Sequence, residues 1–355
     1  SSPGYRDARA WIDDYGFFYL TWEAVAARHE VVFLEFIDAD ESFTQHGVHY
    51  IFQRRGKGGL LFPFSLHRFI ARQKPDVVVV HALLHPLQVL LLRRALGTTV
   101  RIVLQHHAEQ PFHGWRALLQ RMADRAINQY WFTAMGLANM WLQKRLIADA
   151  RKVHEVMETT SVFGPVDRAE ARVESGVQGE RIYLWVGRLN DNKDPLLLVN
   201  AFLRFAQLQP TCRLYMIFGT DDLLPGVQNI LRQHPDQAQC IQLIGKVPHH
   251  DLQHWYNSAD FLVSCSHYEG SGVAVAEAMS CGCIPLFTDI PAFNYMTAKA
   301  CGLSFTPGSE KELLKTLHKS VLLDMDRERG KTLAQFDRKL SAQAIAARIQ
   351  DLLSP

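Results

Sequence analysis

Two glutamates eight positions apart, Glu269 and Glu277, are the residues whose type and spacing most clearly indicate chemistry. The turn Gly270-Ser271-Gly272 follows the first, and the apolar run from Val273 predicts a helix that carries the second. Glycines let backbone N–H groups approach an anion at a helix N-terminus, where the helix dipole favours negative charge. A carboxylate in that loop has the wrong sign for phosphate, but it accepts hydrogen bonds from sugar hydroxyls.

A second polar group follows the predicted strand Arg101–Gln105 in the first half of the chain. Imidazole and carboxylate groups bind metal ions, so a metal-dependent hydrolase is one function that this group allows, with the candidate ligands His106, His107, Glu109 and His113. Adjacent residues on an extended chain point to opposite sides, which opposes a site that needs three converging ligands. We therefore expect no metal ion here. Three further histidines, His249, His250 and His254, are expected on a solvated helix face.

The elements that must position these residues alternate between short β-branched runs and longer amphipathic ones. Alternation of this kind predicts parallel sheets wrapped by helices, with ligands beyond the carboxyl ends of the strands. The predicted strands are Val31–Ile37, His49–Phe52, Asp76–His81, Arg101–Gln105, Ala126–Thr133, Lys152–Glu158, Arg181–Val186, Arg213–Phe218, Cys240–Ile244, Phe261–Cys265 and Ile284–Phe287. The fold class is therefore α/β, with two Rossmann-like, doubly wound domains facing a cleft.

The expected domains are 1–165 and 166–335, and 336–355 is expected to be a C-terminal helix that returns to the first domain. The charged segment Gly164–Glu180 is interpreted as the linker between them. A Rossmann unit opens with a strand and a tight turn, and Ser1-Ser2-Pro3-Gly4 resembles that turn. We therefore expect the sequence to begin just after its first strand.

The composition excludes several classes of protein. The 355 residues carry 38 Lys+Arg against 36 Asp+Glu, and a net charge of +2 argues against nucleic acid as a partner. The six cysteines show no Cys-x-x-Cys spacing, which favours free thiols in a reducing compartment. No apolar stretch reaches the roughly 18 residues of a membrane span. We expect a cytoplasmic protein.

One helix leaves two interpretations open. The predicted helix Trp115–Arg125 places arginines among Leu118, Leu119 and Met122. A core-packing helix with a basic outer face is the favoured interpretation. The alternative is a helix that rests on an anionic membrane, which would give the protein peripheral contact at the inner face of the membrane.

Around Glu269–Pro285 the sequence resembles the retaining GT-B enzymes of glycosyltransferase family 4, which share a Glu-x7-Glu motif. The resemblance is close in the second half of the chain and loose in the first. It extends to three further segments: Val186-Gly187-Arg188-Leu189 with Lys193-Asp194-Pro195, Gly245-Lys246-Val247-Pro248, and Thr288-Asp289-Ile290-Pro291. Ser271 stands where phenylalanine is common in the family, which leaves both carboxylates of the motif in place.

The resemblance implies a hexosyltransferase of glycan or polysaccharide biosynthesis that moves a sugar from a nucleotide-sugar donor, with retention of anomeric configuration. Glu269 would lie near the donor sugar, Glu277 would bind the ribose hydroxyls, and Lys246-Val247 would lie against the base. The catalytic residues implied are Glu269, His107, Arg188 and Lys193. The donor-binding residues implied are Gly187, Arg188, Lys193, Lys246, Val247, Glu269, Gly270, Ser271, Gly272, Val273 and Glu277.

The charge on the leaving diphosphate must be stabilised, and many transferases use a divalent ion held by Asp-x-Asp. The adjacent acids Asp221 and Asp222 lack that spacing, whereas Arg188 and Lys193 can supply positive charge directly. We therefore expect no metal ion and no other cofactor.

The first domain would hold a glycan or lipid-linked acceptor, with His106 or His107 facing the transferred sugar. His107 is preferred and His106 remains open. Besides the hydrolase, a nucleotide-sugar-binding protein without turnover is the other alternative function.

Overall fold

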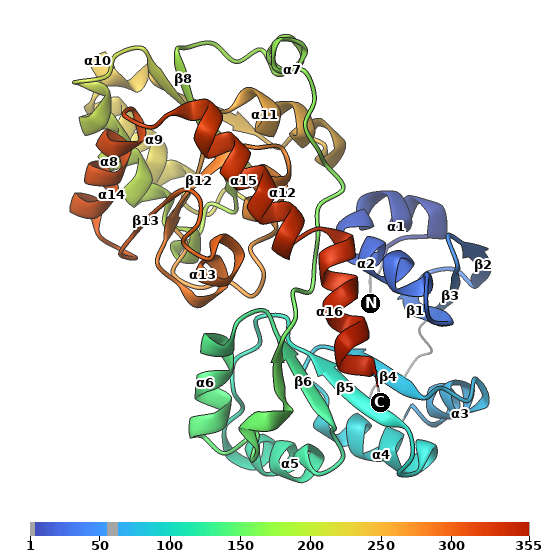
Figure 1. The fold of residues 1–355 in the computed structure, drawn as a ribbon. Helices are drawn as coiled ribbons and strands as arrows, with labels where there is room; N and C mark the ends of the chain where they lie inside the picture. The colour runs from blue at the N-terminus through green and yellow to red at the C-terminus, as the bar shows by residue number, and fades with distance from the viewer. Residues whose placement is uncertain (1–3, 55–62, 355) are drawn as a thin grey trace. The chain divides into compact units, whose positions relative to one another are not determined.

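The computed structural model describes residues 4–54 and 63–354, and the chain divides into two compact units (Figure 1). Unit 1 consists of Ser1–Thr160 together with Ala342–Pro355, and unit 2 consists of Ser161–Ser341. Of the tight turn expected at residues 1–4, only Gly4 belongs to the described residues.

Unit 2 contains one six-stranded sheet in which all neighbouring strands are parallel, in the order β10-β9-β8-β11-β12-β13. Counted from its first strand this order is 3-2-1-4-5-6, the order of a dinucleotide-binding Rossmann domain. The strands are β8 (Arg181–Gly187), β9 (Cys212–Phe218), β10 (Ile241–Gly245), β11 (Phe261–Ser264), β12 (Ile284–Thr288) and β13 (Leu303–Phe305).

The helices of unit 2 connect these strands. They are α7 (Arg168–Ser175), η2 (Asp191–Lys193), α8 (Pro195–Ala206), α9 (Leu224–Gln233), α10 (Pro235–Ala238), η3 (His249–Asp251), α11 (Leu252–Ser258), α12 (Val273–Ser280), α13 (Pro291–Thr297), α14 (Glu310–Ser320) and α15 (Met325–Lys339). Helix α8 buries eight of its twelve residues against the sheet, because its sequence is apolar on nearly every side. Asp194 caps this helix and Pro195 occupies its first turn, so its start is fixed directly after the loop that follows β8.

The interpretation of Gly164–Glu180 as a linker is wrong. Residues Arg168–Ser175 form helix α7, which Asp167 caps and which packs against α11 within unit 2. The Asn257 side chain bonds the Gly164 carbonyl and the Val166 N–H, so the segment before the helix is also tied down. Strand β13 was not predicted, because its three residues are too few to show a period.

Unit 1 contains two sheets among its described residues. The sheet β4-β5-β6-β7 is entirely parallel, whereas in β1-β3-β2 the strand β1 is parallel to β3 and β2 is antiparallel to it. The strands are β1 (Val31–Ile37), β2 (Glu41–Gln45), β3 (Val48–Arg54), β4 (Val77–His81), β5 (Arg101–Gln105), β6 (Gln129–Phe132) and β7 (Val153–Glu155). The helices are α1 (Ala8–Asp14), α2 (Gly16–Ala26), α3 (Phe64–Arg72), α4 (Pro86–Leu96), α5 (Gly114–Asp124), α6 (Met135–Gln143), η1 (Ala150–Lys152) and α16 (Ala342–Leu353).

Strand β2 was not predicted because its sequence, Glu-Ser-Phe-Thr-Gln, is polar. It joins β3 through a two-residue turn in which His46 and Gly47 both have positive φ angles, 46° and 82°. Such turns match the twist of a hairpin. The helix Trp115–Arg125, here α5, packs against α4 and has a basic outer side as expected, but Leu118 and Met122 are exposed and do not join the core.

Helix α16 belongs to unit 1, where it packs against α2. Three side chains hold it to the sheet: Arg101 donates to the Leu353 carbonyl, Gln129 to the Leu352 carbonyl at 3.2 Å, and Arg348 to the Glu155 carbonyl at 3.3 Å. Leu340 and Ser341 separate it from α15.

Candidate functional site

The strand order of unit 2 reverses between β8 and β11, and open α/β sheets bind ligands at this point, beyond the carboxyl ends of the two strands. The loop after β8 carries Arg188 and Lys193, and the loop after β11 carries Glu269. Residues that are far apart in the sequence are therefore brought together at one edge of the sheet by the topology.

The two loops are tied to each other through Asn192. Its side chain donates to the Tyr268 carbonyl at 2.9 Å and accepts from the Tyr268 N–H at 3.1 Å, and its carbonyl accepts from the His267 N–H at 2.8 Å. A further contact of 3.0 Å joins the His267 ring to the carboxylate of Asp194. These bonds fix the shape of the loop that a ligand would meet.

Lys193 and Glu269 form an ion pair across the two loops, and both side chains are mostly buried. Arg188 is exposed and makes no ion pair with the residues that the structure describes. Of the two cations, Lys193 is thus already paired with a carboxylate, whereas Arg188 is available to a ligand.

Gly272 precedes helix α12 with a φ angle of 64°, and a Cβ atom there would lie 2.6 Å from the Phe293 ring. Only glycine fits this position without displacing the ring. The glycine therefore sets how the Glu269 loop enters the helix that carries Glu277.

Glu277 is 2% exposed, and both of its carboxylate oxygens have partners. Oε1 lies 2.6 Å from His249 Nε2, and the Tyr256 hydroxyl donates to Oε2 at 2.9 Å. Burial, followed by the charge and hydrogen bond of Glu277, raises the pKa of Tyr256, so the phenol remains a donor. The prediction that His249 lies on a solvated helix face is therefore wrong. No spacing in the sequence indicated that His249 and Tyr256 are the partners of Glu277.

The segment after β10 borders a recess of about 300 Å³ beside α11. Its lining residues are Glu174, Lys246, Val247, Pro248, Asp251, His254 and Trp255. The recess thus includes Lys246 and Val247, the residues expected to lie against the base.

In unit 1 the structure separates the two candidate histidines. His106 is completely buried, and its ring stacks on Phe132 at a centroid distance of 4.5 Å. The side chain of His107 is 22% exposed, its Nδ1 pairs with Glu158, and its Nε2 lies 3.0 Å from His81 Nδ1. Of the two histidines, only His107 can therefore contact a ligand without a rearrangement of the core.

The three rings of this cluster have different protonation behaviour. Burial lowers the pKa of His107, but the hydrogen bond and charge of Glu158 and the charge of Glu109 outweigh it, so the net pKa is raised. Burial, aided by the charge of His107, lowers the pKa of His81 to about 3. Burial also lowers the pKa of His106. Glu158 therefore favours the protonated form of His107, beside the neutral ring of His81.

The four residues of the hydrolase hypothesis do not converge. His113 lies 3.4 Å from the Lys144 amine, His106 Nε2 contacts the Glu109 carbonyl, and the Glu109 carboxylate accepts from the His107 N–H at 2.7 Å. Across residues 4–54 and 63–354, no three His, Cys, Asp or Glu side chains are placed to share a metal ion. In the same ranges, no helix has the length and apolar character needed to cross a membrane.

The fold is of the GT-B class, as expected. A solved structure of Anabaena HepE in complex with UDP superposes with a TM-score of 0.68 at 15% identity, over 94% of this chain and 95% of that one. Residues 167–340 match the family model described as "Glycosyl transferases group 1". This match covers almost all of unit 2 and just under half of the chain, and it supports a relationship to the group 1 glycosyl transferases.

Sequence relatives agree with this assignment. The D-inositol 3-phosphate glycosyltransferase of Frankia alni is 29% identical over 131 residues, which cover 34% of this chain and 31% of the relative. The matched segment thus spans about a third of the length of that relative and of others like it. A longer match is the GDP-mannose:cellobiosyl-diphosphopolyprenol alpha-mannosyltransferase of Xanthomonas campestris, 26% identical over 74% of this chain and 70% of the relative.

Proposed function

We propose that this protein transfers a sugar from a nucleotide-sugar donor to an acceptor hydroxyl, with retention of anomeric configuration and without a metal ion. The observation that carries the proposal is the meeting of Lys193 and Glu269 at the strand-order reversal of a domain that matches the group 1 glycosyl transferases. A nucleotide-sugar donor is supported by the UDP bound to HepE and by the GDP-mannose in the name of the Xanthomonas relative.

In the proposed reaction the bond between the anomeric carbon and the diphosphate oxygen breaks as the acceptor oxygen bonds to the same carbon on the same face. The departing phosphate takes the proton of the acceptor hydroxyl. Arg188 and Lys193 stabilise the charge that develops on the diphosphate, and the start of helix α12 adds its dipole. Lys193 must exchange Glu269 for phosphate when the donor binds.

That exchange gives Glu269 its role, because a carboxylate released by Lys193 can accept hydrogen bonds from the sugar hydroxyls. Glu277 would bind the ribose hydroxyls, and its existing partners His249 and Tyr256 would hold the carboxylate in place. The acceptor, a glycan or a lipid-linked sugar, would meet unit 1 near His107.

Donor binding tests the proposal first. A thermal-shift panel of UDP-, GDP- and ADP-sugars should raise the melting temperature for one nucleotide class, because a ligand that binds only the folded state stabilises it. Proton NMR of the product then reads the anomeric configuration directly. An inverted product would refute retention while leaving transfer intact, and a lack of response to every nucleotide sugar would refute the donor class.

A further inference from the structure

Helix α5 of unit 1 buries two polar side chains and exposes three large apolar ones. Gln120, Ala123 and Asp124 are buried, whereas Trp115 is 69%, Leu118 59% and Met122 48% exposed. The three apolar positions are spaced i, i+3 and i+7, so they form one stripe along the helix. A contiguous apolar stripe, unlike scattered single residues, marks a surface that contacts something.

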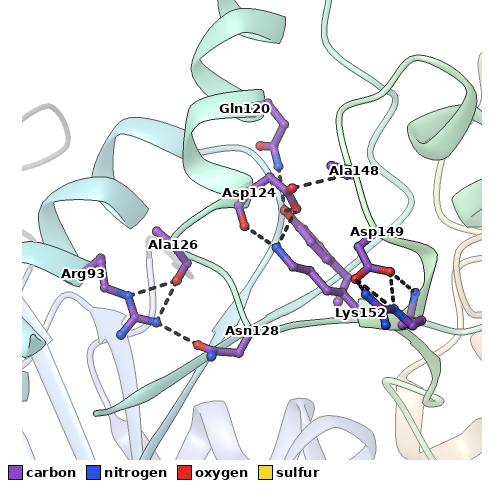
Figure 2. A network of polar contacts seen from close by, with 10 residues as sticks. Arg93, Gln120, Asp124, Ala126, Asn128, Ala148, Asp149 and Lys152 are labelled. Carbon is purple, nitrogen blue, oxygen red and sulfur yellow. Dashed lines mark hydrogen bonds and ion pairs between the residues drawn. The ribbon is translucent and has the colours of Figure 1, made fainter. Parts of the chain in front are cut away.

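Buried hydrogen bonds fix this orientation (Figure 2). The Lys152 amine donates to the Asp124 carbonyl at 2.6 Å, and the Asp124 carboxylate accepts from the Ala148 N–H at 3.3 Å and from the Tyr130 hydroxyl at 3.0 Å. The Gln120 amide donates to the same hydroxyl at 3.4 Å. Rotating α5 to bury the stripe would break these bonds, so the outward apolar side is part of the fold.

Cations surround the stripe. Exposed positive side chains come from α5 and from the end of α6, namely Arg116, Arg121, Arg125, Lys144 and Arg145. Arg121 donates to the Lys144 carbonyl at 3.1 Å, which places the end of α6 beside α5. Asp124 is the only acidic residue between positions 110 and 148, and it is buried and paired with Lys152. A protein with a net charge of +2 thus concentrates positive charge at this face.

We propose that this face, the α5 stripe with its flanking cations, docks on the anionic surface of a lipid bilayer. The helix would lie in the plane of the interface, with Trp115, Leu118 and Met122 among the headgroups and the arginines on lipid phosphates. An anionic bilayer is the partner favoured here, because its negative charge complements the cations around the stripe. A second copy of the chain would set one group of cations against another, which is unfavourable.

Vesicle sedimentation of the full chain tests the docking. The protein should bind vesicles of equal parts phosphatidylcholine and phosphatidylglycerol, bind phosphatidylcholine alone far more weakly, and lose affinity as salt rises. Each arginine near an anionic surface contributes roughly a fivefold gain, so Arg116→Gln, Arg121→Gln and Arg125→Gln combined should weaken binding by about 100-fold. Leu118→Ser with Met122→Ser should weaken it by at least about tenfold.

Matched controls come from exposed residues of unit 2. Leu322→Ser removes a leucine that is 83% exposed, and Arg232→Gln, Lys311→Gln and Lys315→Gln combined remove three exposed cations. Both controls should bind anionic vesicles like the unaltered protein, and equal melting temperatures would show that every variant is folded.

The proposal would be overturned by no binding to anionic vesicles, by equal loss in the controls, or by unchanged binding in both α5 variants. Self-association that ultracentrifugation detects and Leu118→Ser with Met122→Ser abolishes, without vesicle binding, would also overturn it and assign the stripe to a second copy. Nucleotide-sugar binding is read separately, so failure here leaves the proposed transfer untouched.

Discussion

The strand ends of the two units hold their charged groups in different ways. In unit 2, Lys193 is neutralised by Glu269 and Asp194 contacts His267, so the two loops are tied to each other by paired charges. In unit 1, His107 lies between a neutral ring and the Glu158 carboxylate, in a cluster whose geometry favours its protonated form.

The two arrangements would respond differently to a ligand, because only unit 2 has an ion pair that must break. In the proposed donor site, a paired lysine cannot neutralise a diphosphate until its carboxylate has found other partners, so binding in unit 2 would be an exchange. The His107 ring of unit 1 already has His81 and Glu158 as partners, so a ligand would bind there without breaking an ion pair. Breaking an ion pair at a ligand site is costly unless the ligand gives both charged groups new partners.

The largest effect that this comparison predicts is at Lys193. Lys193→Ala should lower kcat by about 10²-fold or more, because it removes a charge that stabilises the leaving group. Steady-state kinetics measure it, with the exposed Lys311→Ala as control. If kcat is unchanged and only the donor KM rises, Lys193 contributes uniform binding and the exchange has no catalytic role.

The next largest effect should distinguish the role of Glu277 from that of Glu269. Glu277→Gln should weaken the binding of a nucleoside diphosphate by roughly fivefold to tenfold, because it replaces charge-assisted hydrogen bonds with neutral ones. Glu269→Gln should not weaken that affinity, because it frees Lys193 for the diphosphate, and it should lower transfer sharply. Calorimetry measures both variants, and equal weakening by the two substitutions would contradict the assignment.

A smaller effect concerns pH and the histidine cluster. Since the pKa of folded His107 is raised above the ordinary 6.5, its contribution to stability is complete below pH 6.5 and is lost as pH rises through the folded value. The free energy of unfolding should therefore fall above pH 6.5, by at most about 1.4 kcal/mol per pH unit from this one proton. The lowered pKa values of His81 and His106 act below pH 6.5, so they do not mask the effect.

Urea unfolding at a series of pH values measures this slope. Glu158→Gln removes the partner that raises the pKa of His107 and should flatten the curve above pH 6.5. Glu41→Gln, at an exposed position of β2, is the control for the loss of one carboxylate. A slope that survives in Glu158→Gln would mean that another group titrates.

The smallest expected effect is the response to chelation. If Arg188 and Lys193 supply the positive charge, EDTA should leave turnover within about twofold, because no metal ion stabilises the leaving diphosphate. Loss of turnover that magnesium or manganese restores would transfer that role from the two cations to a metal ion. EDTA that is already saturated with calcium is the control for inhibition by EDTA itself. It should have no effect on turnover.

The sequence predicted unit 2 more completely than unit 1, because its strands β8, β9, β11 and β12 are mostly buried and appear in the sequence as apolar runs. The strand β8 was predicted to within one residue, and the helix α12 begins at Val273 as predicted. The sequence could not predict β2, whose polar residues pair along one edge of β3 only. The GT-B class itself was confirmed.

The contacts of the candidate site were likewise predictable only in part. The proximity of Lys193 and Glu269 follows from strand order, which the alternation of elements made predictable. The contacts of Glu277 with His249 and Tyr256, and of His107 with His81 and Glu158, depend on how separate elements pack. No local pattern encodes such contacts, because each joins residues at least 21 positions apart.

The return of α16 to unit 1 has a consequence for synthesis on the ribosome. Unit 2 is a continuous stretch, Ser161–Ser341, whereas unit 1 lacks α16 until residues 342–353 have been made. At the usual elongation rate the intervening stretch takes roughly 10 to 40 s to translate. During that time the surface of α2 that α16 later covers is exposed on a nascent chain, so unit 2 can complete its fold before the unit that precedes it.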